Sequence, residues 1–191
     1  GLNLSASAFK ERSTNDWGRY DNSTTERGRI AQGYGQREAK LWDRSLYEFT
    51  ANYQKKINDV HNIGVLAGYS WEENSYELQS GENLLSGDTY SNRNMSRLIS
   101  FFGRATYNYD EKYVLAATVR RDGSSKFGVN NKWGVFPSAS AAWNISKESF
   151  LSSIRTISDL KIRVGYGITG NQDGIDPYRS LNLYGRSSEY Y

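Results

Sequence analysis

Residues 132–146, KWGVFPSASAAWNIS, alternate between two kinds of side chain. The even positions are mostly small or polar, whereas the odd positions are apolar without exception: Trp133, Val135, Pro137, Ala139, Ala141, Trp143 and Ile145. Such alternation predicts a β-strand with one apolar face. It also continues for longer than the roughly five or six residues that are usual for a strand in a soluble protein.

The two tryptophans of this stretch mark its length. A strand from Trp133 to Trp143 is about 33 Å long, and at a tilt of about 40° it rises roughly 25 Å. That rise matches the apolar band of a membrane barrel, which has aromatic girdles at both edges and a height of about 25 Å. We therefore expect the odd positions to face lipid, with Trp133 at the outer interface and Trp143 at the inner one. Tyr113 and Tyr166, in neighbouring stretches, are expected to belong to the same girdles.

Pro137 is the residue of this strand that cannot donate a backbone hydrogen bond. A closed barrel has no free edge at which such a residue is tolerated. We therefore predict a β-bulge or a local break in strand pairing within two residues of Pro137.

The same alternation recurs along the chain. It predicts further strands near residues 1–9, 45–53, 63–71, 98–109, 113–119 and 158–169, and it is weaker at 178–184, where an eighth strand could lie. Between them we expect long polar connections at 11–40 and 73–97, a loop at 122–131, one helical turn near 146–151, and tight turns at Asn58-Asp59 and Asp110-Glu111. Alternating long and short connections are typical of up-and-down barrels. The predicted fold class is therefore all-β, an antiparallel up-and-down transmembrane β-barrel segment.

The composition narrows the class of protein further. Aromatic residues make up 14% of the 191 residues, too many for a disordered chain. The 24 basic and 21 acidic residues are spread along the sequence, so nucleic acid is not an expected partner. Cysteine is absent, which excludes disulfides and thiolate metal sites. The sequence has no run of about 18 apolar residues that could form a membrane helix. The mean hydropathy of −0.74 does not exclude a membrane barrel, because a barrel strand alternates residue by residue and scores as hydrophilic.

Catalytic chemistry has little support in the sequence. The single histidine, His61, lies beside a predicted tight turn, and we interpret it as a solvated turn residue rather than a general base. No metalloprotease, nucleophile-elbow or phosphate-loop motif occurs. Asn171, Asp173 and Asp176 could supply oxygens to a cation, but the EF-hand pattern is absent. We therefore expect no enzyme activity, no cofactor and no metal site.

Candidate binding residues fall into two groups. Side chains on the face opposite the lipid would line a polar lumen, and these are Arg104, Arg120, Phe136, Lys161 and Arg163. Aromatic residues in the expected extracellular loops would contact sugars or peptides, or pack the loops against each other, and these are Trp17, Tyr20, Tyr34 and Tyr90.

Three motifs in the C-terminal half resemble a known family. Arg120–Ser125 (RRDGSS), Trp133–Ser138 (WGVFPS) and Gly167–Gln172 (GITGNQ), in this order and spacing, are similar to the TonB-dependent transporters of the SusC/RagA type. The resemblance is close over about 80 residues. It implies a segment of a larger barrel, expected to have 22 strands, in the outer membrane of a Gram-negative bacterium.

The resemblance also implies partners. Such transporters import oligosaccharides or peptides, are energised by TonB, and are covered by a SusD-like lipoprotein. Residues 1–191 are then expected to be a partial barrel domain, without plug or signal peptide. Two other interpretations stay open at this point: an autonomous eight-stranded outer-membrane adhesin, and a soluble carbohydrate-binding β-sandwich.

Overall fold

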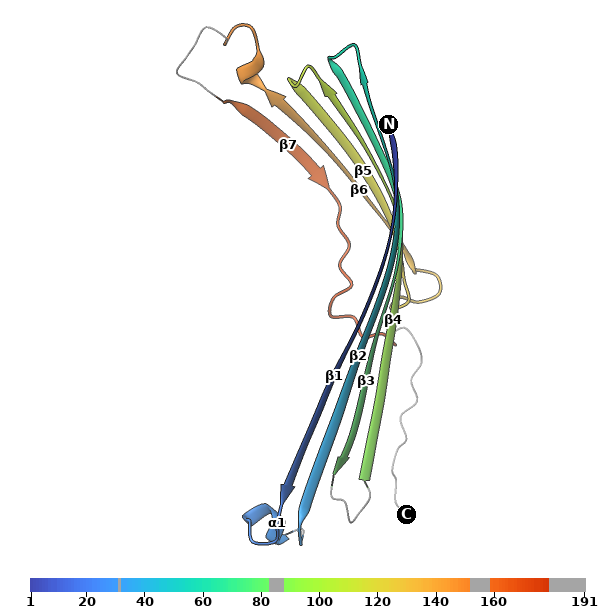
Figure 1. Ribbon diagram of the computed structural model, residues 1–191, viewed down its shortest axis with the longest axis vertical. Coiled ribbons are helices and arrows are strands. Elements are labelled where there is room, and N and C mark those ends of the chain that lie inside the picture. Colours follow the sequence, from blue (N-terminus) through green and yellow to red (C-terminus); the bar gives the residue numbers. More distant parts are fainter. Residues whose placement is uncertain (31, 83–87, 152–158, 179–191) are drawn as a thin grey trace.

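The computed structural model describes residues 1–30, 32–82, 88–151 and 159–178, which form one antiparallel sheet (Figure 1). Its seven strands lie side by side in sequence order. The elements are β1 (Leu2–Asp21), α1 (Glu26–Ile30), β2 (Tyr34–Ile57), β3 (His61–Glu82), β4 (Asp88–Tyr109), β5 (Tyr113–Ser124), β6 (Trp133–Asn144), the 3₁₀ turn η1 (Ile145–Lys147) and β7 (Lys161–Gly167). The all-β prediction is confirmed. In these described ranges no helix has the length and apolar character needed to cross a membrane. The eighth strand considered at 178–184 lies almost entirely outside the described residues.

The strand register places the predicted apolar positions on one face of the sheet. Paired residues form a continuous line across all seven strands: Leu2, Tyr53, Val65, Ala105, Ala117, Ala139 and Tyr166. Because side chains alternate along a strand, every second residue from these positions shares the same face. We call it the apolar face and the opposite one the polar face.

Strands β1 to β4 are much longer than predicted, at 20, 24, 22 and 22 residues, whereas β5 and β6 have 12 each. The long connections expected at 11–40 and 73–97 are therefore largely strands, and that prediction was wrong. Both faces of these segments are polar, so hydropathy stops alternating although pairing continues, for example between Ser13 and Trp42. We call residues 10–21, 34–45, 73–82 and 88–97 the extension, which reaches the bottom of Figure 1, and the remainder of the sheet the seven-strand region.

Both predicted tight turns are confirmed, and they lie at the end of the sheet away from the extension (Figure 1). Asn58 and Asp59 have φ values of 47° and 59°, and Asp110 and Glu111 have 48° and 51°. Asn and Asp tolerate this left-handed conformation, whereas Glu111 has no such tolerance and adopts it under strain. The helical turn expected near 146–151 begins one residue earlier, as η1.

Pro137 leaves one strand pairing intact and ends the other. The β5–β6 pairing passes through Val119–Pro137 without a bulge. The β6–β7 pairing ends next to it at Ser138–Gly167, and the N–H of Ile168 donates to the Pro137 carbonyl oxygen at 3.0 Å. Because the N–H and C=O of one strand residue point toward the same neighbour, the missing N–H of Pro137 is on the β7 side. The predicted break in pairing is confirmed there, and the alternative bulge is not found.

The sheet has no protein core against either face within the described residues. The buried side chains there are polar, namely Asp21, Ser100, Ser124 and Asn144, and no apolar side chain is buried. On the apolar face Leu115 is 51% and Val135 56% exposed. A soluble β-sandwich buries one apolar face of each sheet against the other. The sandwich interpretation is therefore inconsistent with this structure.

Candidate functional site

A row of aromatic rings crosses four strands of the apolar face beside the tight turns. Successive ring centroids are 5.1, 6.3 and 6.4 Å apart in the order His61, Tyr109, Tyr113 and Trp143. The Nδ1 atom of His61 is also 2.8 Å from the hydroxyl oxygen of Tyr107. His61 is therefore a half-buried member of this row, and its interpretation as a solvated turn residue was wrong.

A second row lies at the opposite end of the seven-strand region. The ring centroids of Tyr47 and Trp71 are 5.5 Å apart, and the ring centroid of Phe101 lies 5.2 Å from that of Tyr69 and 6.2 Å from that of Trp133. The guanidinium of Arg121 lies 4.9 Å above the Trp133 ring. Two aromatic rows that enclose an apolar band are the arrangement found in membrane barrels. Tyr166 joins neither row in the described residues, because it pairs with Ala139, midway between the two tryptophans.

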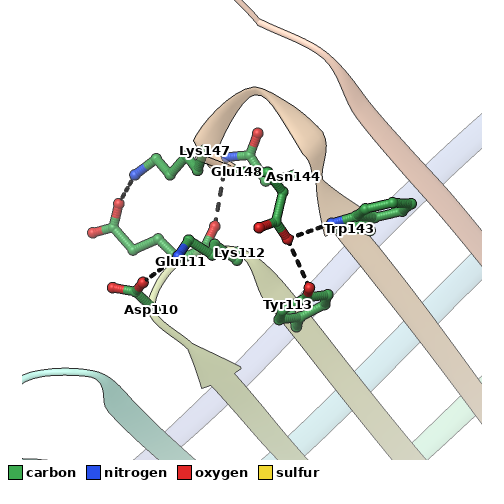
Figure 2. A network of polar contacts seen from close by, with 8 residues as sticks. All are labelled: Asp110, Glu111, Lys112, Tyr113, Trp143, Asn144, Lys147 and Glu148. Atoms are coloured by element: carbon green, nitrogen blue, oxygen red, sulfur yellow. Dashed lines mark hydrogen bonds and ion pairs between the residues drawn. The ribbon is translucent and has the colours of Figure 1, made fainter. Parts of the chain in front are cut away.

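Glu148 holds two members of the first row in place (Figure 2). Its Oε1 atom accepts hydrogen bonds from the Tyr113 hydroxyl at 2.6 Å and from the Trp143 indole N–H at 3.0 Å. These bonds hold the pKa of Glu148 below its ordinary value. Beside it, Lys112 pairs with Asp110 at 2.9 Å and Lys147 pairs with Glu111. The network joins the β4–β5 turn to η1, and so fixes the end of the sheet that carries the first row.

On the polar face Arg120 occupies a fixed position. Its Nε atom donates to both carboxylate oxygens of Asp122 at 2.7 and 2.9 Å, and its Nη2 atom donates to the buried Ser100 hydroxyl oxygen at 2.9 Å. The guanidinium also lies 6.0 Å from the centre of the Phe102 ring. Since Phe102, Arg120 and Phe136 pair across three strands, Arg120 is held between two aromatic rings of the polar face.

The three motifs of the C-terminal half meet at this place. A Cβ atom added to Gly170 would lie 2.2 Å from Cζ of Phe136, so the backbone of 168–171 packs directly on that ring. The amine of Lys126 donates to the carbonyl oxygen of Gln172 at 3.4 Å. Farther along, the Tyr178 hydroxyl accepts the backbone N–H of Met95 at 3.2 Å. The stretch 168–178 therefore runs from β6 to the start of the extension.

The remaining predicted lumen residues share the polar face but not this cluster. Arg104 pairs with Thr118 and Leu66, and Lys161 and Arg163 lie opposite Asn144 and Ala142 near the η1 end. Their location on the polar face follows from the register. Their role as lumen residues stays a prediction.

The extension has a different character on each of its faces. The continuation of the apolar face carries paired charges: Arg12–Asp43 at 2.7 Å, Arg37–Asp16 at 2.6 Å and Arg97–Glu73 at 2.5 Å. Hydrogen bonds from Arg12 and Arg37 hold the pKa values of Asp43 and Asp16 below their ordinary range. The continuation of the polar face also carries ion pairs, Arg19–Asp21, Lys40–Glu38 and Arg44–Glu72, and it adds aromatic rings and neutral polar groups between them. Most of the aromatic rings of the extension, including Trp17, Trp42 and Tyr76, lie on this face.

The four aromatic residues predicted in loops are all in strands. By register Trp17, Tyr34 and Tyr90 lie on the polar face of the extension, and Tyr20 lies on the other face. Their contact with a substrate stays a prediction. Asn171, considered for a cation, instead accepts the backbone N–H of Asp173 at 2.7 Å, and the described residues contain no metal-like cluster of acidic and histidine side chains.

Sequence reasoning missed the pair Trp42 and Tyr76. Their ring centroids are 5.4 Å apart at an interplanar angle of 41°, on the polar face of the extension. Both residues fell in, or at the edge of, segments interpreted as loops. Extending the period of two from 45–53 back to residue 42 would have placed Trp42 on this face.

Comparison with known proteins adds to this geometry. No protein-family model matches the chain. It is 36% identical over 182 residues to the TonB-dependent receptor P3 of Formosa agariphila, a match covering 86% of this chain and 18% of the relative. It is 39% identical over 130 residues to the TonB-dependent receptor SusC of Bacteroides thetaiotaomicron, covering 68% of this chain and 13% of the relative. The structure of the RagAB peptide transporter superposes with a TM-score of 0.83 at 24% identity, over 93% of this chain and 22% of that one.

The fold, the two aromatic rows and the superposition define the class as an antiparallel sheet from the wall of a β-barrel. The sequence matches make it more specific. The chain is a homologue of TonB-dependent receptors of the SusC/RagA type, and it corresponds to a segment of their barrel that spans about a fifth or less of those proteins.

Proposed function

We propose that this chain forms part of the barrel wall of an active importer in the outer membrane of a Gram-negative bacterium, which takes up oligosaccharides or peptides. The observation that carries the proposal is the exposed apolar face, bordered by two aromatic rows and opposite a polar face. A hollow of about 800 Å³ on this face is floored by Ala105, Ala117, Ala139 and Ala141. So large an exposed apolar surface marks a contact with a membrane or another protein, and the two aromatic rows favour lipid.

The proposal assigns a direction to the sheet. The tight turns face the periplasm, because short turns are found there in outer-membrane barrels and longer connections outside. Trp143 and Tyr113 then lie at the inner interface, Trp133 lies at the outer one, and the extension stands above the membrane. Arg104, Arg120, Phe136, Lys161 and Arg163 face the lumen, where they contact the plug or the passing substrate.

The proposed partners come from the relatives. A SusD-like lipoprotein covers the extracellular mouth, and TonB supplies energy through parts of the protein outside this segment. RagAB is described as a peptide transporter, whereas the receptor names of the other relatives specify no substrate. We assign no catalytic role to the chain, in line with relatives that are receptors and transporters.

Uptake by cells tests this function. Cells that produce the full-length protein should accumulate labelled oligosaccharides or peptides, and the uptake should disappear when the gene or TonB is deleted. The protein should also fractionate with the outer membrane. Uptake that continues without TonB, or a protein found in the soluble fraction, would contradict the proposal.

A further inference from the structure

A hollow of about 540 Å³ lies on the polar face of the extension. Its floor is one line of paired residues across four strands: Ser13, Trp42, Tyr76 and Asn94. The next line toward the seven-strand region supplies a polar margin of Glu11, Arg44, Asn74 and Ser96. Pro177, from the stretch that crosses from β6, borders the hollow as well. An aromatic pair, with Trp42 exposed and Tyr76 half-buried, is thus surrounded by amide, hydroxyl, carboxylate and guanidinium groups.

We propose that this hollow binds a pyranose ring of a neutral oligosaccharide. A pyranose has a flat face of C–H groups and a rim of hydroxyl groups. Trp42, which is 38% exposed, and the tilted Tyr76 ring offer apolar surfaces on which the C–H face stacks. The side chains of Ser13, Asn74 and Asn94 are donors and acceptors for the hydroxyl rim.

The charges around the hollow favour a neutral ligand. Arg44 is paired with Glu72 at 3.0 Å, and the Asn74 amide donates to the same carboxylate oxygen at 3.1 Å. The cation is therefore neutralised and its position is fixed. Glu11 adds a negative charge at the margin, which repels uronates and other anionic sugars.

At the level of the hollow the aromatic rings of these four strands lie on the polar face only, whereas ion pairs occur on both faces. On the opposite face the extension presents the ion pairs Arg12–Asp43 and Arg97–Glu73 at the level of the hollow. On the polar face aromatic residues occur again four residues farther out, where Trp17 and Tyr90 belong to one line with Glu38 and Ser80. Four residues of a strand span about 13 Å. A linear oligosaccharide could therefore contact both aromatic levels.

This inference rests on the proposed function, because the polar face of the extension meets a substrate only if it lines the mouth of an importer. Binding by the purified protein, however, requires neither TonB nor transport. The two proposals can therefore fail separately. If cells take up the substrate but substitutions in the hollow leave glycan binding unchanged, only the site is rejected. Binding that depends on the site, without uptake, rejects only the importer.

The test uses the full-length protein in detergent on a glycan array and on a peptide array. We expect binding to neutral glycans, with an affinity loss of about tenfold or more for Trp42→Ala and Tyr76→Ala. Trp42→Phe, which keeps a ring, should lose less. The control is Leu41→Ala, the chain neighbour of Trp42 on the opposite face, and we expect it to bind like the parent protein within about twofold.

Three results would overturn the assignment of the site. The first is an absence of binding to any neutral glycan on the array. The second is glycan binding that is unchanged in both alanine variants, or reduced equally in Leu41→Ala. The third is binding to peptides that is lost with Trp42, which would assign the same hollow to a peptide side chain instead.

Discussion

The seven-strand region and the extension share one sheet and one register, yet their faces meet different surroundings. In the seven-strand region one face is apolar in every strand. In the extension the same face carries ion pairs such as Arg12–Asp43, and the aromatic pair Trp42 and Tyr76 lies on the other side. Backbone pairing and turns therefore determine where the strands lie. The hydropathy pattern of a strand indicates only whether each of its faces contacts lipid or water.

The largest expected effect comes from a charge placed on the apolar face. Ala139→Arg should destabilise the full-length protein by about 2–4 kcal/mol, the cost of an arginine near the middle of a bilayer. The matched change Ala39→Arg is on the same face within the extension, next to Asp16 by register, and should alter stability by less than about 0.5 kcal/mol. Equilibrium unfolding in lipid vesicles measures both. Equal losses of stability in the two variants would contradict the claim that this face meets lipid in one region and water in the other.

The next largest effect concerns the contact that joins two motifs. A methyl group added by Gly170→Ala would overlap the Phe136 ring, so we expect a loss of about 1–3 kcal/mol from overpacking. Phe136→Ala should remove most of that loss in the double variant. The control, Gly174→Ala, has open space at its Cβ but a φ of 81°, and should show no coupling to Phe136. A coupling energy near zero for Gly170 in the double-mutant cycle would rule out the contact.

A smaller gain is expected at the β4–β5 turn. Glu111→Gly should stabilise the protein by up to about 1 kcal/mol, because glycine adopts a positive φ without strain. The exposed pair with Lys147 that is lost is worth little. Asn58→Gly serves as the comparison, since asparagine tolerates the conformation and the gain there should be a few tenths of a kcal/mol at most. A higher unfolding midpoint for Asn58→Gly than for Glu111→Gly would contradict the strain at Glu111.

The smallest effect is a pH dependence at the first aromatic row. The pKa of Glu148 is lower in the folded protein than its ordinary value of 4.5. Its stabilising contribution is therefore present above about pH 4.5 and is lost as the pH falls through the folded-state pKa. The fluorescence of Trp143, in a variant that keeps only this tryptophan, should change over that acid range. In Glu148→Gln the change should be absent. A transition of unchanged size in that variant would mean that another group is responsible.

The sequence allowed the strands of the seven-strand region to be predicted because apolar and polar surroundings impose a period of two. The same logic failed from residue 11 to 40, where both faces are polar and the signal disappears although Ser13 and Trp42 are paired. The turns were predictable from the local conformational preference of Asn58, Asp59 and Asp110, although Glu111 adopts its positive φ against its own preference. Pro137 was placed correctly at a break, but only the register shows that the break is on the β7 side.

The candidate site was less predictable, because it depends on residues that are far apart in the chain. The polar-face location of Arg120 and Phe136 followed from alternation. Their contacts did not, since Ser100 comes from β4 and Gly170 from beyond β7. The assignment of Trp17 and Tyr90 to loops hid their common line on the polar face. Trp42 and Tyr76 were missed for the same reason.

Cysteine accessibility along β2 tests the central claim most directly, because this single strand passes through both regions. In a cysteine-free background of the full-length protein, single cysteines replace Ala51 and Ala39, which lie on the same face, and Thr50, which lies on the other. In intact cells a water-soluble maleimide should label position 39 and not position 51, and position 50 should react once the cells are opened. Equal labelling at 39 and 51 would contradict a face that changes from lipid to water along one continuous strand.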